Sequence, residues 1–274
     1  MSGFYEKLAA GWLSSGSMLC VGLDPDPARL PEVVASSPTP VFEFNRQIIN
    51  ATIDLVCAYK PQVAFYSAFG RESELEQTIE YIKSLNPDIP VILDAKRGDI
   101  GSTAEMYARE AFERYDADAV TVNPYMGGDT LEPFLEYADR GVVILCHTSN
   151  PGSGEFQDRE AGGKPLYMAV AERAGRAWNR HGNVALVVGA TYPEMLGEVR
   201  KMVGDMPILV PGIGTQGGDI EQVLAHGLNS SGTGLVLNAA RSVIYAGDDQ
   251  DFARAARNKA LEFQALINQA GANH

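Results

Sequence analysis

The sequence predicts a (β/α)8 barrel, a TIM barrel of the α/β class, and three observations lead to that fold class. Eight short apolar segments recur along the 274 residues, helical patterns separate them, and each segment is almost continuously hydrophobic. Continuous hydrophobicity is typical of parallel strands buried on both faces. Eightfold strand–helix alternation favours a barrel over the runner-up, a doubly wound open sheet. We expect residues 1–274 to form a single domain with an N-terminal helix.

The elements follow from the spacing of apolar residues. The predicted strands are 18–23, 61–65, 91–93, 119–122, 142–146, 184–188, 208–210 and 234–237. Apolar residues at helical spacing predict helices over 41–59, 75–85, 165–178, from 220 onward, and over 251–269. Phe4, Leu8 and Trp12 share one helical face, which predicts a short N-terminal helix packed on the domain.

The connection 147–165 is unusually long, polar and rich in glycine. It follows the fifth predicted strand, so in a barrel it lies on the catalytic face. Long connections are often functional, but insertions at loops are also tolerated. A lid and a tolerated insertion therefore both stay open.

Composition limits the partners of the chain. The formal net charge is −13, and this argues against nucleic acid and anionic membranes, since both require a basic face. Glu6 and Lys7 interrupt the N-terminus, so it does not resemble a signal peptide, and no segment has the length of a membrane span.

Cys20, Cys57 and Cys146 each lie in an apolar stretch, and none has metal-ligand spacing. They predict buried free thiols and a reducing cytoplasm. Neither the cysteines nor the histidines indicate a metal site.

A charged cluster follows the third predicted strand, in the string Asp94-Ala95-Lys96-Arg97-Gly98-Asp99. Asp94 and Lys96 are two residues apart, so they point to the same side of a strand. At the end of a barrel strand both would face the mouth, where barrel active sites lie. Carboxylates on either side of Lys96 would keep its ammonium charged and able to protonate a carbanion. A structural ion pair at a strand end is the alternative.

Two further residues stand next to predicted strands. Asp24 ends the first strand, where an Asp before Pro is also a common turn residue. Lys60 falls between a helix and the second predicted strand and, taken alone, favours a solvated lysine.

A glycine-rich loop follows the seventh predicted strand, from Pro211 to Asp219, and it leads into a helix. Glycines let backbone N–H groups approach a phosphate closely, and the loops after strands seven and eight of a barrel often hold one. Arg241, after the eighth strand, could hold the same phosphate bidentately, although an arginine on a helix surface is the alternative.

Together these motifs resemble the orotidine 5′-phosphate decarboxylase family, in the branch with Asp-Ala-Lys-Arg-Gly-Asp-Ile-Gly-Ser-Thr, here residues 94–103. This string is highly specific. Segments 22–25, 44–61, 121–125, 148–152 and 211–219 look like the same branch and occur in the same order, so the resemblance covers most of the chain.

The resemblance implies that the enzyme converts orotidine 5′-phosphate to uridine 5′-phosphate, as a homodimer and without cofactor or metal. It implies that Lys96 protonates C6 of the pyrimidine, that Asp94 faces the departing carboxylate and that Lys60 bridges Asp94 and the ribose. Asp99 would reach into the partner's site. The remaining implied contacts are with the substrate: Asp24 with ribose, Ile100 and Thr103 beside Asp99, Ser149 with the pyrimidine, and Pro211, Gly212, Gly214, Gln216 and Arg241 around the 5′-phosphate. We also expect the loop 212–218 to become ordered when phosphate binds.

Two other functions remain open. A related phosphosugar barrel would keep Asp-x-Lys-x-x-Asp and stabilise an enediolate with a divalent metal, which requires another carboxylate at the mouth. Lys60 stands where such a carboxylate would be needed and argues against it. A non-catalytic barrel that senses a nucleotide would not need Lys96 between two carboxylates.

Overall fold

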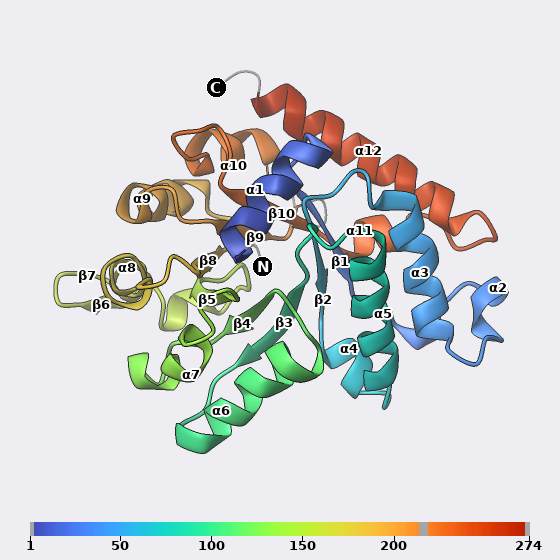
Figure 1. Ribbon diagram of the computed structural model, residues 1–274. Coiled ribbons are helices and arrows are strands. Elements are labelled where there is room, and N and C mark those ends of the chain that lie inside the picture. The colour runs from blue at the N-terminus through green and yellow to red at the C-terminus, as the bar shows by residue number, and fades with distance from the viewer. Residues whose placement is uncertain (1–2, 214–218, 272–274) are drawn as a thin grey trace.

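The computed structural model describes residues 3–213 and 219–271, and eight of its strands are parallel and lie side by side in the order β2-β1-β10-β9-β8-β5-β4-β3. The bridges Tyr59↔Val91 and Gln62↔Asp94 join the two end strands, so the sheet closes into a barrel (Figure 1). The predicted fold class is confirmed. The barrel strands are β1 Leu19–Leu23, β2 Ala58–Pro61, β3 Ile92–Arg97, β4 Ala119–Val122, β5 Gly141–His147, β8 Val184–Val188, β9 Ile208–Pro211 and β10 Leu235–Ala239.

Most of the helices surround the barrel on its outer side, and the N-terminal helix covers one end (Figure 1). The helices are α1 Phe4–Ser15, α2 Glu32–Ala35, α3 Pro40–Thr52, α4 Ala64–Ser67, α5 Glu72–Leu85, α6 Gly101–Arg109, α7 Glu132–Leu135, α8 Leu166–Arg173, α9 Pro193–Val203, α10 Ile220–Gly227, α11 Arg241–Ile244 and α12 Phe252–Gly271. Single π-helical turns, Glu110–Arg114 and Ala174–Trp178, extend α6 and α8.

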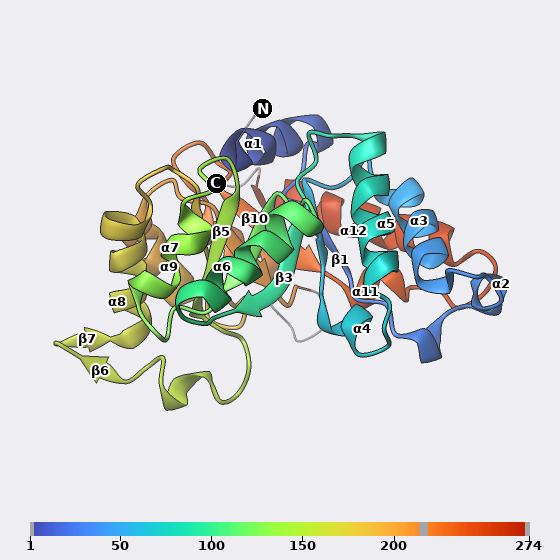
Figure 2. The ribbon, with the colours of Figure 1, turned by 60° about the horizontal axis from the view of Figure 1, so that its bottom comes forward.

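Two apolar cores hold these layers together. The larger fills the space between strands and helices, and the smaller fills the barrel interior with inward-facing residues such as Cys20, Ile92 and Leu209. The apolar face of α1 packs on the domain, as predicted. Its Phe4 and Leu8 belong to the interior core, so α1 closes one end of the barrel, which was not predicted. Figure 2 shows α1 at that end and the hairpin of β6 Glu160–Ala161 and β7 Lys164–Pro165 toward the other.

Gly141 shows how closely α1 is docked. A Cβ on Gly141 would lie 2.4 Å from a ring carbon of Phe4. Any side chain there would push α1 away from the barrel, because protein interiors leave no spare volume.

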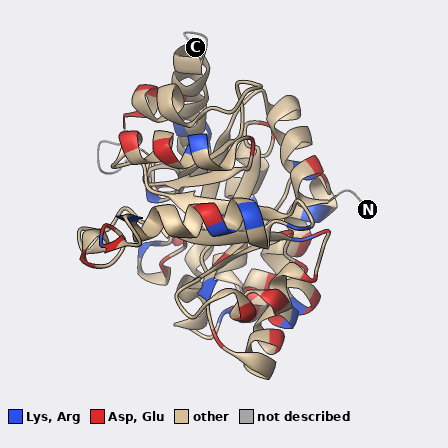
Figure 3. Cartoon of the chain, turned by 90° about the vertical axis from the view of Figure 1, so that its left-hand side faces the viewer, with Lys and Arg blue, Asp and Glu red and all other residues tan. Residues whose placement is uncertain are grey.

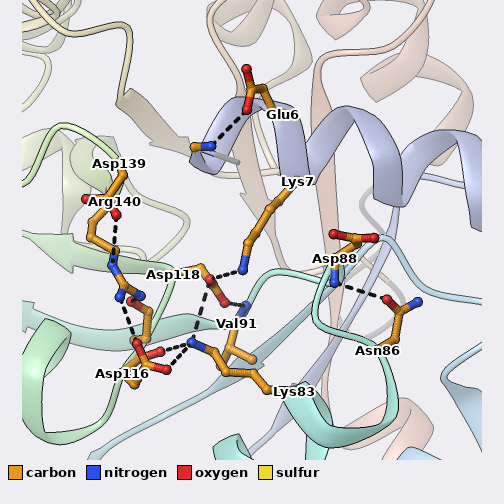
Figure 4. Close-up of polar contacts among 12 residues, drawn as sticks. Glu6, Lys7, Lys83, Asn86, Asp88, Val91, Asp116, Asp118, Asp139 and Arg140 are labelled. Atoms are coloured by element: carbon orange, nitrogen blue, oxygen red, sulfur yellow. Dashed lines mark hydrogen bonds and ion pairs between the residues drawn. The ribbon is translucent and has the colours of Figure 1, made fainter. Parts of the chain in front are cut away.

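Charged side chains secure α1 to the strands it covers. We call Lys7, Lys83, Asp116, Asp118 and Arg140 the basal cluster (Figure 4). The Lys7 Nζ lies 2.6 Å from Oδ1 of buried Asp118, whose Oδ2 accepts the Val91 N–H at 2.9 Å. A side-chain nitrogen of Lys83 and one of Arg140 each lie 2.8 Å from a carboxylate oxygen of Asp116. Asp116 is exposed, whereas Asp118 is buried.

Three predicted boundaries are wrong. The third strand is Ile92–Arg97 rather than 91–93, so Asp94 and Lys96 lie within it rather than after it. The second strand is Ala58–Pro61 rather than 61–65, because Val63 already has helical backbone angles and residues 64–67 form α4. Val63 and Tyr66 are buried three residues apart, as on a helical turn. The helix predicted over 41–59 ends at Thr52, and the chain returns to the barrel at β2. Helices α6 and α9 and the short helices α2, α4, α7 and α11 were not predicted.

The connection 147–165 carries structure of its own. It contains a 3-10 turn, Ser153–Glu155, and the β6–β7 hairpin. The Nε2 of fully buried His147 lies 2.9 Å from an Asp158 carboxylate oxygen, and the Gln157 side chain bonds to Thr148 at the base of the connection. The connection is therefore anchored at its base, while its role as a lid or an insertion stays a prediction.

Other surface and core features bear on the composition. The three cysteines are free and buried, as predicted. Charges of both signs are spread over the outer helices (Figure 3). Within residues 3–213 and 219–271, no helix is both long enough and apolar enough to cross a membrane.

Candidate active site

The end of β3 departs from regular strand geometry. Leu93 pairs with Val120 and Arg97 with Val122, so four steps along β3 match two steps along β4. Two extra residues therefore form a bulge, a device that commonly re-aims side chains beside active sites. Within it Lys96 has a left-handed φ of 47°, which is uncommon for a residue with a side chain.

The bulge brings Asp94 and Lys96 together at the barrel mouth, as their spacing predicts. The Lys96 Nζ lies 2.6 Å from Asp94 Oδ1. Asp94 is buried, whereas 47% of the Lys96 side chain is exposed. The ammonium thus faces a site that a substrate can reach.

Lys60 completes the contact from the neighbouring strand. It lies within β2, contrary to the predicted position before the strand, and is 3% exposed. Its Nζ lies 3.0 Å from Asp94 Oδ2. Burial by itself lowers the pKa of this lysine, but Asp94 and Asp24 outweigh burial and raise the pKa above its ordinary value. Lys60 is therefore a buried cation.

The two carboxylates of the site have opposite pKa shifts. Burial raises the pKa of Asp94, but Lys60 and Lys96 together outweigh it and lower the pKa to about 2. At Asp24, directly after β1, burial dominates and raises the pKa, with Lys60 opposing it. The Oδ1 atom of Asp24 is buried and has no hydrogen-bond partner among the described residues. We call Asp24, Lys60, Asp94 and Lys96 the mouth cluster.

Thr121 on β4 contacts both residues of the bulge, and sequence reasoning assigned it no role. Its hydroxyl donates to Asp94 Oδ1 at 2.9 Å and accepts the N–H groups of Ala95 and Lys96 at 3.0 and 2.9 Å. A polar residue in the otherwise apolar strand 119–122 is the one signal that could have identified it.

Asp99, Ile100 and Thr103 follow the bulge and lead into α6. The Asp99 carboxylate accepts the Ile100 N–H at 2.8 Å. In the part of the chain that the structure describes, Asp99 forms no ion pair with the mouth cluster, although sequence placed it next to Lys96. Ile100 is 62% exposed, and Thr103 is also exposed.

The other predicted contacts lie after later strands. Ser149 follows β5 and is half-buried, and a Cβ on Gly189 would come within 2.9 Å of its backbone. Pro211 ends β9, and Gly212 has a φ of 94°, a conformation that glycine adopts readily. Arg241 is exposed at the start of α11, and its charge opposes the raised pKa of Asp24. Gly214 and Gln216 lie outside the described residues, as does most of the loop 212–218.

The sequence and the fold of this chain are similar to those of known proteins. The sequence model of the orotidine 5′-phosphate decarboxylase / HUMPS family matches residues 17–256. The chain is 56% identical over 266 residues to orotidine 5′-phosphate decarboxylase from Ralstonia pickettii, covering 97% of this chain and 98% of that protein. It is 55% identical to the Cellvibrio japonicus enzyme of the same name, covering 98% and 99%. The solved structure of Leishmania donovani OMP decarboxylase superposes with a TM-score of 0.85 at 39% identity, covering 98% of this chain and 99% of that one.

Proposed function

This chain belongs to the orotidine 5′-phosphate decarboxylase family, and from that premise we propose that it converts orotidine 5′-phosphate to uridine 5′-phosphate without a cofactor, with Lys96 as the proton donor. We further propose that the whole chain acts as one barrel domain. The observation that carries the proposal is the continuous contact from Lys60 through Asp94 to Lys96 at the barrel mouth.

The proposed reaction requires a proton at the carbon that loses CO2. When the bond between C6 and the carboxylate breaks, its electron pair stays on C6, and a proton from the Lys96 ammonium forms the new C–H bond. The exposed Lys96 Nζ beside Asp94 is suited to this transfer, because a carboxylate favours the charged form of a lysine.

Asp94 acts on the ground state of the same step. With its pKa lowered to about 2, it is ionised at neutral pH. A substrate carboxylate placed next to it is repelled, and the repulsion is relieved as CO2 departs. Such a difference between ground state and transition state lowers the barrier.

The sugar and phosphate would bind around Asp24 and Arg241. The buried Oδ1 of Asp24 has no partner in the described part of the chain and suits a ribose hydroxyl, since buried acceptors without a donor are unfavourable. The exposed guanidinium of Arg241, together with Pro211, Gly212, Gly214 and Gln216, would hold the 5′-phosphate. Ser149 would contact the pyrimidine.

We propose a homodimer in which Asp99 enters the partner's site, beside Ile100 and Thr103. Ile100, Met106, Tyr125 and Met126 are exposed apolar residues, and a Cβ on neighbouring Gly98 would lie 3.6 Å from Met126. Exposed apolar side chains of this kind suit an interaction surface. The free, buried cysteines suit a reducing compartment, and we propose the cytoplasm.

Direct turnover of orotidine 5′-phosphate, followed by the loss of orotate absorbance, tests the activity. We expect turnover with purified protein and the same rate in excess chelator. A chain that binds uridine 5′-phosphate but turns over no carboxylated precursor would contradict the proposal, and loss of turnover in chelator would favour the metal-dependent alternative.

Mixing two inactive variants tests the shared site. Lys96→Ala and Asp99→Ala chains should each be inactive, and hybrid dimers should regain part of the activity, because one of their two sites then holds both wild-type groups. If subunits exchange and no activity returns, Asp99 serves its own chain.

A further inference from the structure

We propose that Thr121 is a positioning residue that fixes Asp94 and Lys96 relative to one another; this rests on the proposed function of the mouth cluster. Thr121 lies on β4 with 1% of its surface exposed. Its hydroxyl contacts both the carboxylate of Asp94 and the backbone N–H of Lys96.

The bulge in β3 creates the need for such a residue. Because two extra residues stand opposite β4, the N–H groups of Ala95 and Lys96 cannot follow the regular ladder. Both donate instead to the Thr121 hydroxyl oxygen, at 3.0 and 2.9 Å. Ala95 is half-buried and Lys96 is exposed, and both hydrogen bonds are partly buried, so the Thr121 hydroxyl gives these two N–H groups an acceptor that the regular ladder does not supply at the bulge.

The same hydroxyl orients the carboxylate. Its proton goes to Asp94 Oδ1 at 2.9 Å, the oxygen that also contacts Lys96 Nζ, while Oδ2 faces Lys60. With two bonds accepted and one donated, the Thr121 hydroxyl uses its full hydrogen-bonding capacity. It therefore holds the carboxylate plane and the left-handed backbone of Lys96 as one rigid unit.

Packing alone is the alternative explanation, since a β-branched residue suits a buried strand. Thr121→Val separates the two because it keeps the shape of the side chain and removes its hydrogen bonds. Thr121→Ser is the matched control, because it keeps the hydroxyl and removes the methyl group. We expect Thr121→Val to lower kcat by roughly 10- to 100-fold, the effect of a misplacement of about 1 Å.

The pattern across variants is the decisive readout. Thr121→Ser should retain kcat within about threefold, because its hydroxyl can still form the same bonds. The KM should change little in either variant, since Thr121 lies behind the reacting groups rather than against sugar or phosphate. Equal losses in both variants, or a Thr121→Val enzyme with wild-type kcat, would overturn the proposal.

A second measurement does not depend on turnover. The rate at which acetic anhydride labels Lys96, followed by peptide mass spectrometry, reports how firmly Asp94 holds the ammonium. We expect faster labelling in Thr121→Val than in wild type and Thr121→Ser, and equal rates in all three would contradict the positioning role. Failure of the wild-type chain to decarboxylate orotidine 5′-phosphate would instead reject the proposed function. If Thr121→Val does not fold, Thr121→Cys replaces it, because a thiol is a weak donor and acceptor.

Discussion

Buried charged side chains lie at both ends of the barrel, but the two clusters differ in how completely these charges are paired. In the basal cluster, the buried carboxylate of Asp118 has a partner on each oxygen, from Lys7 and from the Val91 amide. In the mouth cluster, Asp94 is equally well paired, but Asp24 has a buried oxygen that finds no partner within residues 3–213 and 219–271, and Lys96 is half-exposed.

This difference separates charges that serve the fold from charges that serve a ligand. A buried polar group without a partner is unfavourable, so natural proteins rarely keep one unless a function requires it. The basal cluster gains its stability within the chain. The mouth cluster, in contrast, keeps hydrogen-bonding groups on Asp24 and Lys96 that a bound molecule can contact.

The largest expected effect is at the mouth. Replacing Lys96 with Ala removes the proposed proton donor and should lower kcat by about 10³-fold or more, within the range for general acid catalysis. The half-exposed side chain supports little of the core, so the urea midpoint should stay near the wild-type value. Orotate absorbance and urea unfolding measure the two quantities. Normal turnover in this variant would assign the proton to another group.

At the base, the same kind of change should have the opposite outcome. Asp118→Ala leaves Lys7 and the Val91 N–H without their acceptor, and should lower the free energy of unfolding by about 3 kcal/mol, as expected when a buried pair is broken. Turnover per folded molecule should not change. Asp139→Asn, at the exposed rim beside Arg140, is the matched control and should shift stability by less than about 0.5 kcal/mol. A similar loss of unfolding free energy in both variants would contradict the distinction between buried Asp118 and exposed Asp139.

Acid should affect the mouth through Asp94. Its pKa falls from an ordinary value of 3.8 to about 2 in the folded chain, so its ionised form contributes about 2 kcal/mol of stability above pH 4. That contribution is lost as the pH falls from about 4 to about 2. Unfolding of wild type and Asp94→Asn, measured across this range, should give curves that converge toward pH 2. A constant gap between the curves would contradict the assignment.

The smallest effect concerns Asp24, whose pKa is raised by burial. A carboxylate with a raised pKa in the folded state loses stability as the pH rises above its ordinary pKa. Asp24→Asn should therefore gain stability at pH 7, and the gain should shrink in acid. The KM for orotidine 5′-phosphate should increase. A variant that is less stable at pH 7 would show that Asp24 supports the fold.

The sequence predicted the mouth cluster better than the elements that hold it. The spacing of Asp94 and Lys96 predicted that they lie on one side of the chain, and they do meet, although a bulge rather than a regular strand brings them together. The bulge was not predictable, because it depends on the pairing of β3 with β4, and hence Thr121 remained without a role. The strand containing Lys60 was misplaced because Val63 and Phe65 alternate as in a strand, although tertiary packing folds them into a helical turn.

The basal cluster was not predicted at all. Its members come from α1, α5 and the segments before β4 and β5, and only the closed barrel brings them together. Separations of tens to more than a hundred residues leave no local pattern. The order of the strand ends could be predicted from the sequence, but the ion pairs at the end of the barrel that α1 covers could not.

The closure of the barrel has one more consequence. Strands β2 and β3 meet only through the bridges Tyr59↔Val91 and Gln62↔Asp94, together with the contact between Lys60 and Asp94. The β8–β9 junction also has two paired positions, but those are consecutive, whereas the two β2–β3 bridges are isolated, so we expect local opening to begin between β2 and β3. The ion pair between Lys60 and Asp94 thus also links β2 to β3. A mutation that changes its chemistry therefore also changes how readily these two strands separate.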